Sequence, residues 1–305
     1  MTPTFTIVIP HKNAFEDLKR CLSTIPDIDD IQVIVVDDNS KDMDESVFYG
    51  LSRKNTEFIF NKESKAAGHA RNLALEKAKG EWLIFSDCDD YFVDNMYETA
   101  KASVAENDAD IIFFFLKLDN ISSQKNPIVP ATEYYYTHFD DDVAAKEYMF
   151  RYKTMQPWNK IIRRSLVVEN NIKFQETLVS NDYYFSVVSG YYAKKVKCIP
   201  TFFYVYVIRD IASVSKLKNE SAMLDRVRAY GSVIQFQANH GVTPDYGLLY
   251  SYLYGVLRKD RSMYNRLKNI LGDYISVRFL LLKVFHWRLL NSKVDFTRYC
   301  PIYNR

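Results

Sequence analysis

The first 120 residues alternate between short runs of β-branched or aromatic residues and longer segments with apolar residues at helical spacing. This alternation is typical of βαβ units, in which crossover helices join parallel strands. Because the short runs are almost continuously apolar, both faces of the sheet are expected to be covered. The predicted fold class is therefore α/β, with a mostly parallel sheet flanked by helices. We expect strands at 5–10, 31–37, 56–60, 81–87 and 110–118.

The pattern changes twice further along the chain. From about residue 119 to 215 the alternation gives way to short strands, loops and helices, which we interpret as a lid or acceptor-binding region. From about residue 216 onward the apolar spacing is helical. A chain of 305 residues suits two domains of roughly 150 residues each. We therefore predict an α/β domain over 1–215 and a helical, basic region over 216–305.

The charge is balanced over the whole chain but not along it. There are 40 Lys or Arg and 38 Asp or Glu, a net charge of +2, which argues against a nucleic-acid partner. Residues 251–305 nevertheless hold 11 Lys or Arg against 3 Asp or Glu. A basic, aromatic-rich helix expected at 274–290 predicts peripheral contact with an anionic membrane surface. The alternative is a helix that packs on the main domain with its cations in solvent.

Cysteine usage and the apolar segments indicate a compartment. Cys21, Cys88, Cys198 and Cys300 lie apart without a C-x-x-C pair, so we expect reduced thiols and no zinc site. The N-terminal residues lack the basic and long apolar regions of a signal peptide, and no window approaches 18 uninterrupted apolar residues. These features predict a cytoplasmic protein, soluble or peripheral on the inner face of the membrane.

Acidic residues follow two of the expected strands. In open α/β sheets, ligands bind beyond the carboxyl ends of the strands, where this chain has DDNSKD at 37–42 and DCDDYF at 87–92. A D-x-D pair at the end of a buried strand brings like charges together, which favours a bound cation. Mg²⁺ or Mn²⁺ with Asp89 as its ligand fits, since these ions take one or two carboxylates and complete their shell with phosphate and water. Asp87 is placed to accept a hydrogen bond from a ribose. An ordinary acidic turn is the alternative.

Two further features suit an anionic nucleotide. Asp38 at the tip of the second strand is placed to accept a hydrogen bond from a ribose hydroxyl or a base N–H. The alternative is an Asx-turn in which Asn39 or Asp42 caps the next helix. The helix that opens at Gly68 carries Arg71 in its first turn, where free N–H groups favour anions.

Four segments taken together resemble one protein family. The segments TIVIPHKN, VIVVDDNSKD, KAAGHARNLALEKAKGEWLIFSDCDD and PWNKIIRRS are similar to bacterial family 2 glycosyltransferases in order, spacing and strand-end placement. The resemblance covers about residues 4–215 and implies the GT-A fold of nucleotide-diphospho-sugar transferases, here with a helical C-terminal extension. It implies that Asp89 binds the metal that bridges the diphosphate. It also implies a nucleotide-sugar site lined by Pro10, His11, Asp37, Asp38, Arg71, Asp87 and Cys88.

The resemblance extends to the segment NNIKFQETLVSNDYYFSVV. Family members often carry a Glu-Asp pair at a helix start beneath the acceptor cleft, and this chain has Asn181-Asp182. Asp182 is therefore implied to be the general base, while the family's Glu is not matched. A second departure is His11-Lys12, where relatives commonly place an aromatic residue near the base ring. Trp158 and Lys160 are expected to contact the acceptor, with core packing and solvent exposure as their respective alternatives.

The implied reaction is a single displacement that inverts the anomeric carbon of a hexose. The donor is a nucleotide-diphosphate sugar, with UDP favoured, and the acceptor is a hydroxyl of a glycan or lipid-linked glycan in bacterial surface polysaccharide synthesis. A non-catalytic nucleotide-sugar or glycan-binding domain is one alternative. An Asp-based phosphotransfer protein is another, although Tyr91 stands where its D-x-D-x-T/V pattern needs Thr or Val. A nucleotidyltransferase would need a glycine-rich N-terminal loop, which the sequence lacks.

Overall fold

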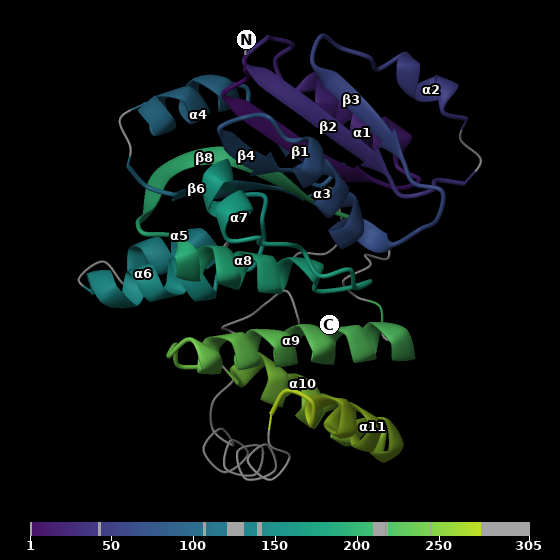
Figure 1. The fold of residues 1–305 in the computed structure, drawn as a ribbon, viewed down its shortest axis with the longest axis vertical. Helices are drawn as coiled ribbons and strands as arrows, with labels where there is room; N and C mark the ends of the chain where they lie inside the picture. The colour runs from purple at the N-terminus through teal and green to yellow at the C-terminus, as the bar shows by residue number, and fades with distance from the viewer. Residues whose placement is uncertain are drawn as a thin grey trace. The chain divides into compact units, whose positions relative to one another are not determined.

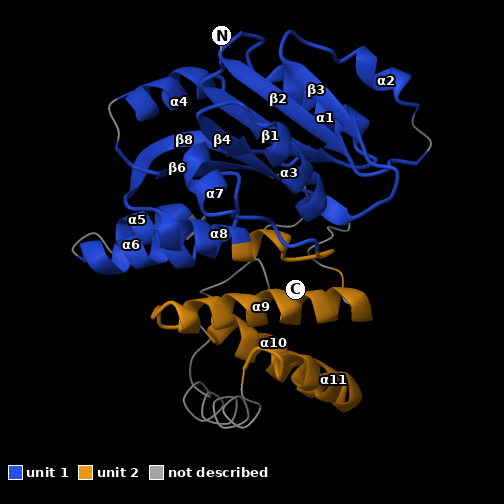
Figure 2. Cartoon of the chain, in the orientation of Figure 1, with its two compact units in different colours: residues 1–176, 185–211 blue, residues 177–184, 212–305 orange. Residues whose placement is uncertain are grey.

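A computed structural model describes residues 2–41, 44–105, 108–120, 131–138, 142–209, 217, 219–244 and 246–275 (Figure 1). The chain divides into two compact units, residues 1–176 with 185–211 and residues 177–184 with 212–305 (Figure 2). The division falls within helix α8 (Asn181–Tyr192), whose first four residues belong to the second unit. The domain boundary after residue 215 stays a prediction.

The described strands of the first unit form one mixed sheet in the order β3-β2-β1-β4-β7-β6-β8-β5. Strands β1 to β4 run parallel to their neighbours in that group, and β6 runs parallel to β8. Strand β7 pairs antiparallel with β4 and β6, and β5 pairs antiparallel with β8. The five strands predicted from the sequence are confirmed. The bounds are β1 (Phe5–His11), β2 (Ile31–Asp37), β3 (Thr56–Phe60), β4 (Trp82–Phe85), β5 (Tyr91–Phe92), β6 (Ile111–Asn120), β7 (Lys160–Arg163) and β8 (Val196–Ile208).

Helices cover both faces of this sheet (Figure 1). Alternate residues of β1 show why, because Ile7 and Ile9 belong to one apolar core with Leu18 and Leu22 of α1. Val8 is fully buried on the opposite face, and α3 packs on β1 and β2. Burial on both faces explains the continuous apolar runs. The helices of this unit are α1 (Phe15–Ser23), α2 (Ser46–Tyr49), α3 (Ala66–Lys77), α4 (Met96–Ala105), α5 (Ala131–His138), α6 (Val143–Tyr152), α7 (Arg164–Glu169) and the last eight residues of α8.

The parallel strands β1, β2 and β4 bring their carboxyl ends to one edge of the sheet. The register pairs His11 of β1 with Asp37 of β2. The hydrogen-bonded ladder between β1 and β4 ends at Val8, whose carbonyl accepts a hydrogen bond from the Ser86 N–H. Pro10, which has no N–H to donate, therefore lies in β1 beyond the end of that ladder. The acidic turn after β4 and the acidic turn after β2 both start at this edge.

The second unit is helical in its described part. It contains α9 (Glu220–Asn239), α10 (Gly247–Leu257) and α11 (Arg261–Leu271), and each packs on the other two. Asn219 caps α9 and Asp260 caps α11, because their side chains accept the N–H of Ala222 at 2.9 Å and of Met263 at 2.8 Å. The predicted helical C-terminal extension is therefore present.

Residues 177–184 join these helices. The Leu178 N–H donates to the carboxylate of Asp225 on α9 at 2.9 Å, and Tyr183 packs edge-on against Tyr230. The basic helix was predicted at 274–290, and all of this range after Ile275 lies outside the described residues. Among the residues that are described, no helix is both long and apolar enough to cross a membrane.

Candidate active site at the carboxyl ends of β2 and β4

Three carboxylates gather in the turn after β4. One oxygen from each of Asp87, Asp89 and Asp90 lies within 4.8 Å of the others. The turn is closed by the Asp90 N–H, which donates to the Asp87 carbonyl at 3.2 Å. Asp90 is buried and accepts the Tyr204 hydroxyl at 2.9 Å and the Val207 N–H at 2.8 Å. Asp90 is thus held by β8, whereas Asp87 is half-buried and Asp89 is exposed.

The positive charges near this acidic cluster do not offset the desolvation and mutual repulsion of Asp89 and Asp90. Although Asp89 is exposed as a residue, desolvation of its carboxyl group by nearby protein atoms and the charge of Asp87 raise its pKa. Burial and the charges of Asp89 and Asp87 raise the pKa of Asp90 well above its usual value. Arg71 supplies one positive charge, with its Nη2 2.6 Å from Asp87 Oδ1. A divalent cation fits this donor set, because carboxylate oxygens are its preferred ligands and it would favour the ionised forms. Asp87 and Asp89 would hold it, since both oxygens of Asp90 already accept protein hydrogen bonds.

Helix α3 fixes two segments at once. Its Arg71 is buried, pairs with Asp87, and lies over the ring of Phe174 at 5.2 Å. The next residue, Asn72, donates to the Phe174 carbonyl at 3.0 Å and accepts the Phe174 N–H at 2.9 Å. His69 Nδ1 lies 3.0 Å from the carboxylate of Glu176. The GHARN motif therefore ties both the acidic turn and residues 174–176 to one helix.

Asp38 is buried and surrounded by donors from its own chain. A carboxylate has about four lone-pair sites, so these donors fill it. Burial opposes its ionised form, but hydrogen bonds from Lys65, Ser64 and Asn61 outweigh burial and lower the pKa of Asp38. Its predicted nucleotide role stays a prediction. The donors are Lys65 N (2.8 Å), Ala66 N (3.0 Å), Ser64 Oγ (2.7 Å), Asn61 Nδ2 (3.3 Å) and Lys12 Nζ (3.5 Å).

His11 and Asp37 form a buried pair that joins β1 to β2. The Ala14 N–H donates to His11 Nε2 at 3.1 Å, which assigns the ring proton to Nδ1. That nitrogen lies 2.7 Å from Asp37 Oδ1. Asp37 also accepts the N–H of Ser40 at 2.9 Å and its hydroxyl at 2.5 Å. The imidazole packs edge-on against Phe48 rather than facing solvent. The nucleotide-sugar contacts expected of His11 and Asp37 stay predictions.

Four other residues singled out in the sequence pack inside the first unit. Pro10 is buried in β1, and burial raises the pKa of the Cys88 thiol well above its usual value. Trp158 is 8% exposed and stacks on Tyr204 at 5.2 Å between ring centres. Lys160 is 2% exposed, and its Nζ donates to the Thr154 carbonyl at 2.9 Å. The acceptor contacts expected of Trp158 and Lys160 stay predictions.

Asp182, the predicted general base, belongs to the second unit. It lies in the first turn of α8 and is half-buried. The residue before the helix, Ser180, has a φ of 57°, an uncommon value for serine. Its neighbour Asn181 donates to the Thr177 carbonyl at 3.4 Å. The role of Asp182 as base stays a prediction.

Several residues that surround the acidic turn could not be assigned to it from the sequence. Tyr204 is one of many aromatic residues of β8, and nothing in its spacing marks it. Asp17 and Arg20 of α1 stand three residues apart, which is also the spacing of an ordinary helix-surface pair. In the structure Arg20 Nη2 donates to the Asp89 carbonyl at 2.5 Å, and Arg209 pairs with Asp17.

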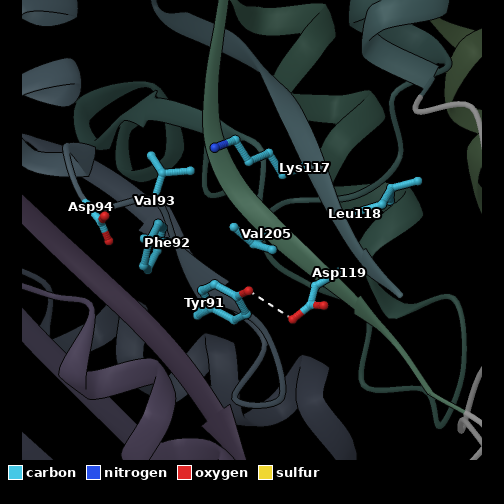
Figure 3. A pocket seen from close by; sticks show the side chains of 8 residues that line it. All are labelled: Tyr91, Phe92, Val93, Asp94, Lys117, Leu118, Asp119 and Val205. Carbon is cyan, nitrogen blue, oxygen red and sulfur yellow. Dashed lines mark hydrogen bonds between the residues drawn. The ribbon is translucent and has the colours of Figure 1, made fainter. Parts of the chain in front are cut away.

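An open pocket of about 290 Å³ adjoins the end of the acidic turn (Figure 3). The Tyr91 hydroxyl donates to Asp119 at 2.9 Å within it. None of the residues that line this pocket was predicted to bind the donor, the metal or the acceptor. The lining residues are Tyr91, Phe92, Val93, Asp94, Lys117, Leu118, Asp119 and Val205.

The family model for Glycosyl transferase family 2 matches residues 6–169, more than half of the chain. This chain belongs to glycosyl transferase family 2. The matched range contains the acidic turns after β2 and β4 and Arg71, so the predicted family is confirmed on the part of the chain that carries these residues.

Curated relatives of this family 2 chain are similar at low identity. The putative glycosyltransferase EpsH of Bacillus subtilis (strain 168) is 24% identical over 72% of this chain and 65% of its own length. The poly(ribitol-phosphate) beta-glucosyltransferase of Bacillus spizizenii is 28% identical over 67% of this chain and 32% of its own length. The chain thus spans about two thirds of the length of the first of these relatives and about a third of the second.

Solved structures share the fold. Staphylococcus aureus TarS 1–349 in complex with UDP-GlcNAc has a TM-score of 0.60 and 18% identity, covering 96% of this chain and 76% of TarS 1–349. A mannosyltransferase from Pyrobaculum calidifontis, solved with GDP-Man and Mn²⁺, has a TM-score of 0.54 and 15% identity, covering 95% of this chain and 81% of its own. The predicted GT-A fold is confirmed by these matches.

Proposed function

We propose that the chain is an inverting, metal-dependent glycosyltransferase. It moves a sugar from a nucleotide diphosphate, with UDP favoured, to a hydroxyl of a glycan or lipid-linked glycan in cell-surface polymer synthesis. The observation that carries the proposal is the cluster of Asp87, Asp89 and Asp90 in a family 2 chain. Such a cluster suits a diphosphate bound through Mn²⁺ or Mg²⁺, ions that coordinate few carboxylates and fill their shell with phosphate oxygens.

The relatives support the same donor and acceptor classes. TarS was solved with UDP-GlcNAc, and the mannosyltransferase with GDP-Man and Mn²⁺. Two relatives are named for transfer of glucose or N-acetylglucosamine to poly(ribitol phosphate). A polymer acceptor at the cell surface is therefore favoured, and UDP is the nucleotide of the donor bound by TarS.

On the donor side, the protein's own residues supply orientation. A divalent cation at Asp87 and Asp89 would provide Lewis-acid stabilisation of the charge that grows on the departing nucleoside diphosphate. Arg71 orients Asp87 through the 2.6 Å ion pair, and Asp90 anchors the turn to β8. Because the protein's own side chains supply these contacts, the orientation of the turn does not depend on the donor.

On the acceptor side, Asp182 takes the proton of the attacking hydroxyl. The acceptor oxygen forms its bond to the anomeric carbon from the face opposite the diphosphate, and the bond to the diphosphate breaks with its electron pair on the leaving group. The configuration at the anomeric carbon is inverted by this single displacement. General-base catalysis of this kind typically contributes about 10²- to 10⁴-fold to the rate.

Thermal unfolding with nucleotides tests the donor class. UDP with Mn²⁺ is expected to raise the unfolding temperature, whereas UDP alone and GDP with Mn²⁺ raise it less. Ligand at 100 times its Kd stabilises the native state by about 2.7 kcal/mol. Transfer is then followed by UDP release, and the anomeric configuration of the product is read by NMR. A product that retains the donor's configuration would exclude the inverting mechanism.

The Asp182→Asn variant tests the base. It is expected to keep stabilisation by UDP and Mn²⁺ and to lose about 10²- to 10⁴-fold in transfer. Asp273→Asn changes an exposed aspartate in the same unit and should behave as wild type. Normal turnover by Asp182→Asn would remove the base assignment. Stabilisation by a UDP-sugar without transfer to any glycan offered would instead favour a binding domain.

A further inference from the structure

Two arginines meet at the backbone carbonyl of Asp89. Arg20 of α1 places its Nη2 2.5 Å from this oxygen, and Arg209, which follows β8, places its Nη2 at 3.4 Å. They reach Asp89 from 69 and 120 residues away in the sequence. A carbonyl in a turn is ordinarily satisfied by water or by a backbone N–H, so two charged donors on one such oxygen need a reason.

Asp17 of α1 orients both guanidinium groups. Arg209 pairs with it through two hydrogen bonds, Nη1 to Oδ2 at 2.6 Å and Nη2 to Oδ1. Arg20 Nη2 lies 3.5 Å from the same carboxylate. The Arg209 and Asp17 side chains are 17% and 22% exposed, so the pair is largely sheltered from solvent. Bidentate pairing fixes the plane of a guanidinium group and leaves it few alternative orientations.

The carbonyl held by these arginines belongs to the peptide between Asp89 and Asp90. On the far side of that peptide, the Asp90 carboxylate is held by the Tyr204 hydroxyl and the Val207 N–H. The peptide is therefore fixed from both ends. A fixed peptide restricts the backbone torsion of Asp89, and with it the directions in which the Asp89 carboxylate can leave the chain.

Arg20 also holds the residue that follows Asp90. Its guanidinium lies 5.3 Å from the ring centre of Tyr91, within the range of a cation–π contact. The Tyr91 hydroxyl in turn donates to Asp119 of β6 (Figure 3). One arginine thus contacts the chain at Asp89 and at Tyr91, and it connects the acidic turn to the wall of the neighbouring pocket.

We propose that Arg20 and Arg209, oriented by Asp17, are positioning residues that hold Asp89 in the geometry needed to bind a divalent cation. The inference rests on the proposed function, in which Asp89 is a metal ligand. Groups that orient a metal ligand typically change metal affinity by about 10- to 100-fold when they are removed. If the three residues served only to fasten α1 to the end of β8, their loss would lower stability and leave metal affinity unchanged.

The test measures Mn²⁺ affinity rather than turnover. Binding of Mn²⁺ to the whole chain in the presence of UDP is followed by the loss of the EPR signal of the free ion. Arg20→Gln, Arg209→Gln and Asp17→Asn are each expected to bind Mn²⁺ about 10- to 100-fold more weakly than wild type. Arg209→Lys should recover part of the loss, because an ammonium group keeps the charge without the bidentate geometry.

Arg53, which lies between α2 and β3, offers a matched control that contacts the end of α1. Its guanidinium donates to the carbonyls of Leu22 at 2.6 Å and Ile25 at 2.5 Å, at the C-terminal end of α1. Arg53→Gln therefore removes two guanidinium–carbonyl bonds without touching the acidic turn. It is expected to lower the unfolding temperature and to keep wild-type Mn²⁺ affinity.

The outcomes separate this inference from the function on which it rests. Wild-type Mn²⁺ affinity in folded Arg20→Gln and Arg209→Gln would overturn the positioning role and leave the metal site standing. Equal weakening in Arg53→Gln would overturn it as well, because the effect would then be a general one of α1. Failure of the wild-type chain to bind Mn²⁺ would remove the metal from the proposed function and the inference with it.

Discussion

The two acidic strand ends of the sheet look alike in sequence and differ in their electrostatics. After β2, hydrogen bonds from the protein outweigh burial and lower the pKa of Asp37 and Asp38. After β4, burial and mutual repulsion raise the pKa of Asp89 and Asp90. The first pair has its negative charge satisfied by the scaffold, whereas the second group has charge left for a cation. Adjacent aspartates at the two strand ends therefore differ in how far the protein's own donors stabilise their charge.

The cause of the difference lies in the loops. After β2, the chain returns at residues 61–66 and points the N–H groups of Lys65 and Ala66 at Asp38. Ala66 has a φ of 67° there, an uncommon value for alanine. After β4, Arg71 reaches the Asp87 carboxylate, whereas Arg20 and Arg209 donate to the Asp89 carbonyl. Substituting Asp by Asn at each end therefore tests the comparison directly.

The largest effect is expected from Asp89→Asn. Loss of the ligand carboxylate should lower transfer by about 10³-fold, because stabilisation of charge on the leaving group is usually the largest single contribution to such reactions. UDP release from the donor sugar at saturating Mn²⁺ measures it. Asp94→Asn, which changes an exposed carboxylate in the neighbouring pocket, serves as control. A rate within tenfold of wild type would show that the charge after β4 does not serve the donor.

Asp38→Asn is expected to act on stability instead. The amide keeps one acceptor oxygen and turns an N–H₂ group toward donors such as the Ser64 hydroxyl and the Ala66 N–H. Leaving buried donors unpaired should cost about 2 kcal/mol, measured by urea unfolding. Asp44→Asn, at an exposed aspartate that accepts the Ser46 N–H, should cost clearly less. Equal losses at the two positions would show that the buried hydrogen bonds of Asp38 contribute no more to stability than the exposed one of Asp44.

More of the fold than of the site could be predicted from the sequence. The five predicted strands were found because buried parallel strands are continuous apolar runs, and β1, β2 and β3 match almost residue for residue. The position of β8 between β6 and β5 was not predictable, since it depends on pairing across a long stretch of chain.

The site was predictable only where the pattern is local. The acids at Asp87 and Asp89 follow directly from the end of a strand. That Asp38 is saturated depends on donors 23 to 28 residues away, and the Arg209 partner of Asp17 is 192 residues away. Neither distance leaves a periodicity in the sequence, so these contacts could not be predicted from it.

Acid should lower the stability of the fold by protonating carboxylates that accept hydrogen bonds from the protein. Burial opposes the charge of Asp30, but hydrogen bonds from Lys101, Thr4 and Tyr97 outweigh it and lower its pKa to about 2. A carboxylate with a depressed folded pKa contributes stability above its unfolded pKa, near 4, and loses it as the pH falls toward 2. After solvent screening, Asp30 should contribute on the order of 1 kcal/mol. Urea unfolding at about pH 5 and pH 3 measures this, and an equally steep loss in Asp30→Asn would exclude Asp30 as its source.

The smallest expected effect tests the comparison of the two strand ends most sharply, because the free energy of unfolding should change in opposite directions at Asp89 and Asp38, or not at all at Asp89. Without metal, Asp89→Asn should leave the free energy of unfolding unchanged or raise it by no more than about 0.5 kcal/mol. The sign follows from the raised pKa of Asp89, which means that the ionised carboxylate is disfavoured in the folded chain. The effect is small because the residue is exposed. The same exchange at Asp38 should lower it. Urea unfolding in EDTA measures both variants, and adding UDP with Mn²⁺ should stabilise wild type but not Asp89→Asn. Destabilisation of similar size at both positions would mean that the protein satisfies both strand ends alike, and a cation would then have no electrostatic reason to choose the turn after β4.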